Sequence, residues 1–165
     1  MAKNDFRIHS TGGLSAVLTK KMQTEANATA ILAGEPVILK IAGSPYVIPA
    51  ADGDPVIGTT TQVMGIAASN SDHTASADGT VEVYLPSAEV IWEGKAKTSS
   101  TVDTQSELDA LRNDRVVWDL TSSTYTIDAA AGDGAAKGIQ IVGGDPDRSV
   151  VYFIIRPGAS EAPIA

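Results

Sequence analysis

The sequence contains no cysteine, which excludes a disulfide framework, a thiolate nucleophile, an iron–sulfur cluster and a cysteine-ligated zinc site. Aromatic residues make up only 5% of the 165 residues, so a sugar-binding face rich in aromatic rings is poorly supplied. Basic residues are also scarce, because 12 Lys and Arg against 20 Asp and Glu leave a formal net charge of −8. A chain with this charge repels phosphate backbones, and we expect no nucleic-acid partner.

Long apolar runs are missing as well. No stretch approaches the ~18 apolar residues of a membrane-spanning helix, so we expect no membrane partner. The first ten residues are polar and of mixed charge, and they lack the apolar segment of a signal peptide. These features predict a protein that is made in a cytoplasm.

The motifs that mark common enzymes are absent too: the sequence has no G-x-S-x-G, no H-E-x-x-H and no G-x-G-x-x-G. His73 beside Asp72 could serve as a general base, but its polar surroundings favour a solvated loop residue. The sequence therefore offers no reaction and no catalytic residue. A small enzyme that uses His73 with an Asp remains an alternative.

Two pairs of alternating carboxylates resemble the start of a calcium loop: Asp52 with Asp54, and Asp145 with Asp147. Neither pair continues to a third acid or a distal glutamate. Both pairs adjoin Pro or Gly, where Asp commonly bonds to the backbone of a turn. We favour turn chemistry over a metal site at both places.

What the sequence does contain favours strands. Ile and Val together number 28 against 8 Leu, and branched side chains fit a pleated sheet better than a helix. Alternating or continuous apolar runs between Gly, Pro and Asp turns predict strands at 37–41, 46–48, 56–58, 63–67, 80–86, 89–94, 115–120, 124–127, 138–142 and 150–155. Thr104 and Glu107 have the spacing of a capping box, which predicts one helix at 104–113. The expected fold is mainly β: a small sandwich, barrel or β-tulip-like body with short strands, one short helix and an extended N-terminal arm.

The chain is expected to have three parts: an N-terminal arm at 1–33, a β-rich body at 34–157 and a loose tail at 158–165. The arm lacks sustained periodicity, so it should need a partner to become ordered, and removal of residues 2–20 should leave the body folded.

The body contains two segments with a similar sequence pattern. One run from Gly65 to Pro86 and another from Gly138 to Pro157 both read as strand, Asp/Gly turn, strand and Pro stop. They are either two unrelated hairpins or equivalent units of a two-part fold, 34–95 and 115–157, joined by a helical linker at 96–114.

Several stretches resemble capsid decoration proteins of tailed bacteriophages, which are also called cement or head-stabilising proteins. They are 34–37 (GEPV), 53–58 (GDPVIG), 63–67 (VMGIA), 78–86 (DGTVEVYLP) and 143–153 (GGDPDRSVVYF). The resemblance covers roughly residues 34–157 and consists of turn-and-strand rhythm rather than catalytic signatures.

The resemblance implies a β-rich protein, tulip-like or sandwich-like, that sits as a homotrimer on the outside of the expanded phage head. Such proteins bridge neighbouring major capsid proteins, are not enzymes and bind no cofactor. The expected location is the outer capsid surface of the virion, after synthesis in the bacterial host cytoplasm. The alternative from another class is a phage tail, fibre or surface β-module that recognises a host glycan or protein.

Two sets of residues are expected to make these contacts. We expect the arm to lie along an adjacent capsid subunit through Phe6, Arg7, Ile8, Leu14, Val17 and Leu18. Trp92 and Trp118 are expected at the oligomer interface, since large aromatic side chains dominate interface energetics.

Overall fold

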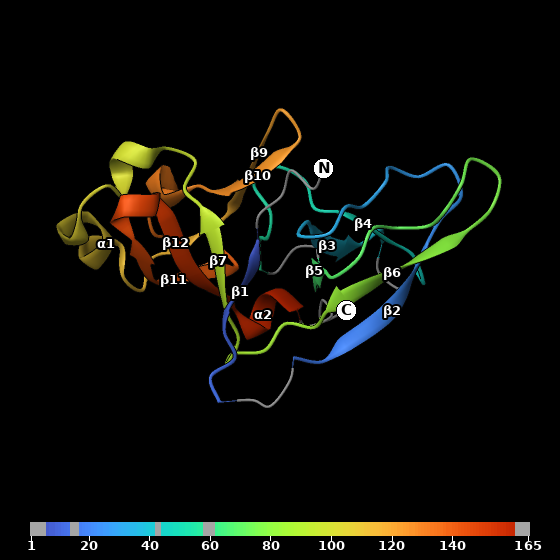
Figure 1. Cartoon of the computed structure of the whole chain (residues 1–165), viewed down its shortest axis with the longest axis horizontal. Helices are drawn as coiled ribbons and strands as arrows, with labels where there is room; N and C mark the ends of the chain where they lie inside the picture. Colours follow the sequence, from blue (N-terminus) through green and yellow to red (C-terminus); the bar gives the residue numbers. More distant parts are fainter. Residues whose placement is uncertain (1–5, 14–16, 42–43, 58–61, 161–165) are drawn as a thin grey trace.

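The computed structural model describes residues 6–13, 17–41, 44–57 and 62–160. These residues form a mainly β molecule built from two five-stranded antiparallel sheets and a separate two-stranded hairpin, which confirms the predicted fold class. Neither sheet closes into a barrel within these residues. Figure 1 shows the two sheets side by side along the long axis of the molecule.

The first sheet contains the last strands of the chain together with one strand from near its start. Its order is β1 (Arg7–Ser10), β7 (Ile91–Lys95), β12 (Val150–Ile155), β11 (Ile139–Asp145) and β8 (Arg115–Val116). The second sheet has the order β2 (Thr19–Thr24), β6 (Gly79–Tyr84), β5 (Val63–Ala67), β3 (Pro36–Leu39) and β4 (Val47–Pro49). The hairpin consists of β9 (Trp118–Thr121) and β10 (Thr124–Ile127). Three short 3₁₀ turns, η1 (Ser99–Thr101), η2 (Ala129–Ala131) and η3 (Pro146–Arg148), complete the connections.

One hydrophobic core joins the two sheets. Trp92 and Phe153 from the first sheet belong to the same buried cluster as Ile38 and Ile66 from the second sheet. Trp118 of the hairpin is part of this cluster as well. Burial of apolar surface between the sheets, the main favourable term in folding, therefore makes them one packed unit.

The second sheet also surrounds a smaller core of its own, formed by Met22, Ile31, Val37, Val47, Ala67, Val81 and Val83. The sheet curls around this cluster so far that its two edge strands, β2 and β4, meet at an isolated bridge between Gln23 and Tyr46.

The predicted helix is present as α1 (Gln105–Leu111), and its start has the predicted capping box. The hydroxyl of Thr104 accepts a hydrogen bond from the Glu107 amide at 3.3 Å, and the Glu107 carboxylate accepts one from the Thr104 amide at 3.0 Å. Leu108 anchors the helix in the main core with no exposed surface.

The described part of residues 1–33 is not an arm outside the body. β1 pairs with β7 and β2 pairs with β6, so this segment supplies an edge strand to each sheet. Ile31, close to its end, is 1% exposed. The expected arm does find an ordering partner, but that partner lies in its own chain, 55 to 86 residues away. Local periodicity carries no sign of such a distant pairing.

Three smaller expectations are also corrected. The predicted strand at 115–120 is divided into β8 and β9, which belong to different sheets. At the predicted strand 56–58, Val56 makes only an isolated bridge to Lys137, and residue 58 lies outside the described residues. The start of the expected loose tail forms the short helix α2 (Pro157–Ser160), in which Ala159 is 1% exposed, and residues 161–165 lie outside the described residues.

The two segments with a similar sequence pattern become the hairpins β5–β6 and β11–β12, one in each sheet. Their equivalence as units of a two-part fold stays a prediction. The expected boundaries at 34–95 and 115–157 are crossed by the shared core, because it contains residues from both spans.

Candidate functional site

The two tryptophans do not lie at the surface of the molecule. Trp92 and Trp118 are both 0% exposed, and both belong to the core that joins the sheets. The expectation that they anchor an oligomer interface is therefore wrong. An alternating strand pattern shows that a large side chain lies on one face of a strand, but not whether that face meets solvent or the core.

Phe6, expected to contact a capsid subunit, is a core residue with 3% of its surface exposed. Its ring meets Phe153 edge to face with centroids 5.3 Å apart and lies 6.2 Å from Trp118. The neighbouring position in β7 is Gly94, where an added Cβ would stand 2.5 Å from the Phe6 ring. The absence of a side chain at Gly94 thus makes the space that Phe6 fills, and Phe6 is corrected from an interface residue to an anchor of β1.

The other expected contact residues are divided. Ile8 and Val17 are partly buried against the main core, whereas Arg7 is exposed but bonded to Glu93. Leu18 is 73% exposed and remains available to a partner. Leu14, the remaining residue of this set, lies outside the described residues.

A charged cluster on the outer side of the first sheet is the most concentrated polar feature there. The Glu93 carboxylate, 8% exposed, accepts hydrogen bonds from Arg7 of β1 and from Arg148 of η3 at 3.2 Å. His9 lies 3.4 Å from the same carboxylate and stacks on Tyr152 with ring centroids 3.7 Å apart. Burial raises the pKa of Glu93, but the hydrogen bonds from the two arginines outweigh it and hold the pKa below its usual value. The cluster is an electrostatic clamp that fastens β1 to the sheet.

Two of the paired carboxylates, Asp54 and Asp145, bond within their own turns, as favoured from the sequence, whereas Asp52 bonds to a residue 68 positions away. Asp52 accepts from the Leu120 amide at 3.0 Å, and Asp54 accepts from the Ala51 amide at 2.8 Å. Asp145 accepts from the Arg148 amide at 3.3 Å and so caps η3. Across the described part of the chain, no three His, Cys, Asp or Glu side chains gather in a way that could hold a metal ion.

His73 and Asp72 do not form an acid–base pair. Nε2 of His73 lies 2.9 Å from the Ala28 carbonyl oxygen, whereas Asp72 accepts from the amide of Thr80. The hydrogen bond from the Thr80 amide is the main reason why the pKa of Asp72 lies below its usual value. Both side chains serve to hold the loop before β6, and nothing orients them toward a shared reactant.

A pocket of about 340 Å³ opens between the β9–β10 hairpin and the second sheet. It is lined by Thr29, Ala30, Glu35, Ile48, Pro49, Ala50, Leu120, Ser123 and Tyr125. Burial raises the pKa of Glu35, which is 7% exposed, and also the pKa of Tyr125, whose hydroxyl donates to the Ala50 carbonyl. No motif in the sequence marked this pocket, because its walls come from three separate segments.

The comparisons with known proteins add no relative: no family model, no curated protein and no solved structure matches the chain. Within the residues that the structure describes, no helix is long and apolar enough to cross a membrane.

Proposed function

We propose that this protein binds the outer surface of an expanded phage capsid and stabilises it by bridging neighbouring major capsid proteins. The proposal includes assembly as a homotrimer on the shell. The residue resemblance to phage decoration proteins is its starting point.

The observation that carries the proposal is the place of the resembling stretches in the fold. Residues 63–67 are β5, residues 78–86 contain β6, and residues 143–153 include the turn η3 between β11 and β12. The described part of the stretch 53–58 is joined to the hairpin, since the Gly53 amide donates to the Trp118 carbonyl at 3.0 Å. The similar residues thus form the central strands and turns of the molecule, where a shared architecture would require them.

Other features support a binding role. The Asp and His side chains considered as candidates for catalysis or metal binding bond instead to backbone amides and carbonyls. Leu18 and Ile41, at 73% and 65% exposure, are the large hydrophobic side chains that the described surface presents to a partner. The net charge of −8 suits a part that sits outside the shell, away from the packaged DNA.

Stabilisation of the shell follows from mass action. A protein that binds the assembled, expanded shell but not its separated subunits lowers the free energy of the assembled state at each site. At a free concentration of one hundred times Kd the gain is about 2.7 kcal/mol per site. Because the sites repeat over the whole shell, a modest contact becomes a large resistance to rupture.

The test is co-sedimentation of the purified protein with expanded, undecorated capsids of the phage that encodes it. We expect saturable binding and a rise in the temperature at which the shell ruptures. A folded protein that does not sediment with these capsids would contradict the proposal.

A second candidate, a surface β-module that recognises a host glycan or protein, is favoured by the pocket beside Glu35 and Tyr125. Its volume of about 340 Å³ falls within the range of small-ligand sites. A glycan array separates the two candidates: reproducible binding that is lost in Ser123→Trp would favour recognition, and an array without binding would count against it.

A further inference from the structure

The curled second sheet leaves a seam between its two edges. β2 and β4 are the end strands of the sheet, and in the described residues they meet only at the bridge between Gln23 and Tyr46. Beside this bridge, residues of β2 and the described residues next to β4 line an opening of about 260 Å³. An edge strand presents unpaired backbone amides and carbonyls on its outer side, so this part of β2 can accept a further strand.

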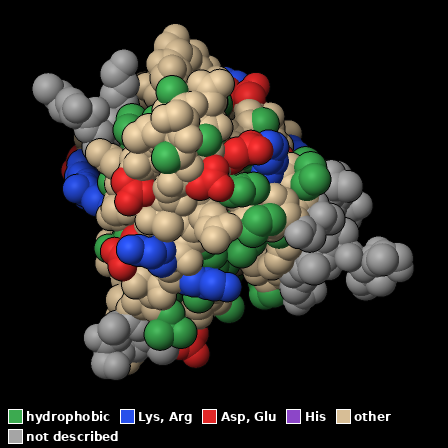
Figure 2. All heavy atoms as spheres, turned by 90° about the vertical axis from the view of Figure 1, so that its right-hand side faces the viewer, with side chains coloured by type: hydrophobic (Ala, Val, Ile, Leu, Met, Phe, Trp, Pro, Cys, Tyr) green, Lys and Arg blue, Asp and Glu red, His purple; other side chains and the backbone are tan. Residues whose placement is uncertain are grey.

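The bottom of the seam is apolar. Its apolar lining is Met22, Leu39, Val47 and Met64, and the other residues that line it are Lys20, Lys21, Gln23, Ser44 and Pro45. Apart from Met1, Met22 and Met64 are the only methionines in the chain. Methionine is unbranched and adaptable and is used heavily at surfaces that receive partner side chains. Figure 2, which views the molecule from the end formed by the second sheet, shows hydrophobic side chains gathered on part of that face.

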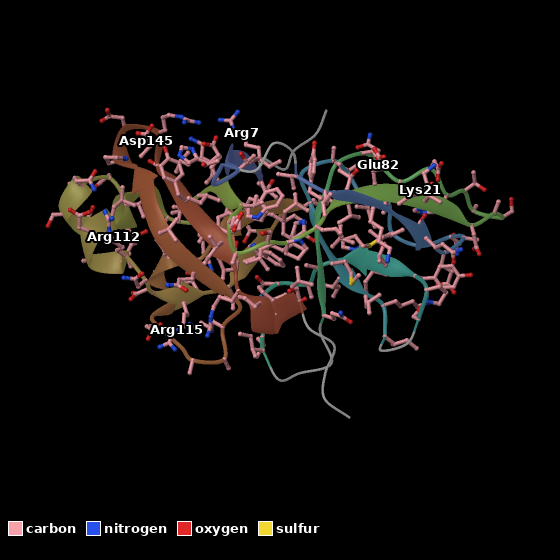
Figure 3. The ribbon with its side chains drawn as sticks, turned by 90° about the horizontal axis from the view of Figure 1, so that it is seen from below. Arg7, Lys21, Glu82, Arg112, Arg115 and Asp145 are labelled. Carbon is pink, nitrogen blue, oxygen red and sulfur yellow. The ribbon has the colours of Figure 1, made fainter. Side chains whose placement is uncertain are left out.

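The charge at the rim indicates the chemistry of the occupant. Lys20 is exposed and makes no salt bridge with any described residue. It shares a face of β2 with Met22, because side chains two residues apart point the same way. Lys21, the next residue of the strand, alternates to the other face and is paired in register with Glu82 of β6. Figure 3 shows the Lys21 and Glu82 side chains on these neighbouring strands. Lys20 is therefore an unmatched cation beside an apolar opening, in a molecule whose net charge is −8.

We infer that the seam binds an extended segment of the major capsid protein, which adds as a strand to the free edge of β2. An apolar side chain of that segment enters between Met22 and Met64, and a carboxylate beside it pairs with Lys20. The inference rests on the proposed function and deepens it by naming the kind of segment that is bound. Strand addition supplies affinity through backbone hydrogen bonds, while the apolar opening and Lys20 supply specificity.

The absence of cysteine allows a direct test by site-specific labelling. Lys20→Cys and Lys21→Cys place one thiol each on adjacent residues of β2, on opposite faces of the strand. Each variant is labelled with the same environment-sensitive fluorophore and mixed with expanded, undecorated capsids. We expect the label at position 20 to shift to the blue and become protected from a soluble quencher, and the label at position 21 to change much less.

Charge reversal tests the same surface without a label. Lys20→Glu and Lys21→Glu change the net charge by the same amount on neighbouring residues, and circular dichroism verifies that both variants fold. We expect Lys20→Glu to weaken capsid binding by about tenfold at low salt, with a smaller effect from Lys21→Glu.

The outcomes separate the inference from the function on which it rests. Wild-type binding to capsids with equal protection of both labels and equal affinity of both charge variants would overturn the seam while leaving the capsid role intact. Wild-type protein that does not bind capsids would overturn both. Protection of position 20 that depends on protein concentration in the absence of capsids would assign the seam to a second copy of this chain and overturn the assignment to the capsid protein.

Discussion

At the scale of single residues, the N-terminal strand is held by two side chains of opposite character. Phe6 fills the space above Gly94 in the core, and Arg7, the next residue, bonds to Glu93 on the outer side of the sheet. The two contacts lie on opposite faces of the first sheet, as successive residues of a strand require. Each can be removed without touching the other.

Phe6→Ala should destabilise the protein by about 3–5 kcal/mol, because it leaves a cavity between Phe153 and Trp118. Chemical denaturation followed by tryptophan fluorescence measures the change. Leu18→Ala is the matched control, since Leu18 is 73% exposed and its loss should change stability by no more than about 0.5 kcal/mol. Equal stability of the two variants would contradict the placement of Phe6.

Glu93→Gln tests the clamp through its pH dependence. The pKa of Glu93 in the folded protein lies below its usual value of 4.5, so its ionised form contributes stability above about pH 4.5. That contribution is lost as the pH falls through the folded pKa. We expect the variant to be less stable than the wild type at pH 7, with the difference shrinking below pH 4.5, as measured by denaturation at a series of pH values. A difference in stability between the variant and the wild type that stays the same at every pH would contradict the clamp.

At the scale of elements, single residues decide where a helix begins and how closely two strands can approach. The helix α1 has its own start signal in the capping box of Thr104 and Glu107. The β5–β6 pair depends instead on close approach, because Gly65 has φ +140° and an added Cβ would lie 1.9 Å from the Tyr84 carbonyl oxygen.

Thr104→Ala should cost about 1 kcal/mol, because it removes the acceptor for the Glu107 amide and breaks the capping box. Ser106→Ala is the control: Ser106 is exposed within the same helix, and alanine is a better helix former. The midpoint of urea denaturation should therefore fall for Thr104→Ala and rise slightly for Ser106→Ala. An equal fall of the midpoint in both variants would argue against the cap.

Gly65→Ala should prevent folding or cost more than about 4 kcal/mol, because the methyl group would overlap the carbonyl of the paired strand. Gly143→Ala is the matched control in the other hairpin, where the nearest atom to an added Cβ is 3.7 Å away in the Tyr152 ring. Expression yield and circular dichroism compare the two, and a well-folded Gly65→Ala would refute the close approach.

At the scale of the whole molecule, the two sheets depend on each other and on the start of the chain. Their shared core contains Ile66 from one sheet and Phe153 from the other. β1 is an edge strand of the first sheet and β2 is an edge strand of the second, and only residues 11–18 separate them in the chain. The N-terminal segment therefore ties the two sheets together.

Deletion of residues 2–20 should abolish the native fold rather than leave a stable body, because it removes β1, Phe6 and the first part of β2. Circular dichroism and the cooperativity of thermal unfolding measure the result, with the full chain carrying Leu18→Ser as the folded control. A truncated protein that keeps a cooperative transition at the wild-type temperature would restore the arm as a separate part.

Local signals allowed much of the fold to be predicted. The strand at 63–67 and the helix at 104–113 could be found because each is written in neighbouring residues: an apolar run between turns, and a capping box before an apolar stripe. The turn role of Asp54 and Asp145 was accessible for the same reason, but the bond from Leu120 to Asp52 was not, because the two residues are 68 positions apart. β1 and β2 could not be predicted in this way, because their apolar residues are few and their pairing with β7 and β6 depends on segments far along the chain.

The candidate surfaces were far less accessible to sequence reasoning. The sequence predicts that Trp92 and Trp118 are contact residues, but the structure buries both. The seam between β2 and β4 was not foreseen, because it exists only where one sheet curls until its edges almost meet. Met22 and Met64 are 42 positions apart, and no spacing rule connects them.

By itself, the sequence determined the β-rich class, the acidic surface charge, the site of the helix and the turns, because these follow from composition and from interactions within a few residues. Tertiary structure alone decided which apolar side chains form the core and which remain for a partner. The physical reason is that burial is a property of the packed sheets: Phe6 and Trp92 are hidden and Leu18 is left in solvent according to what lies across from each.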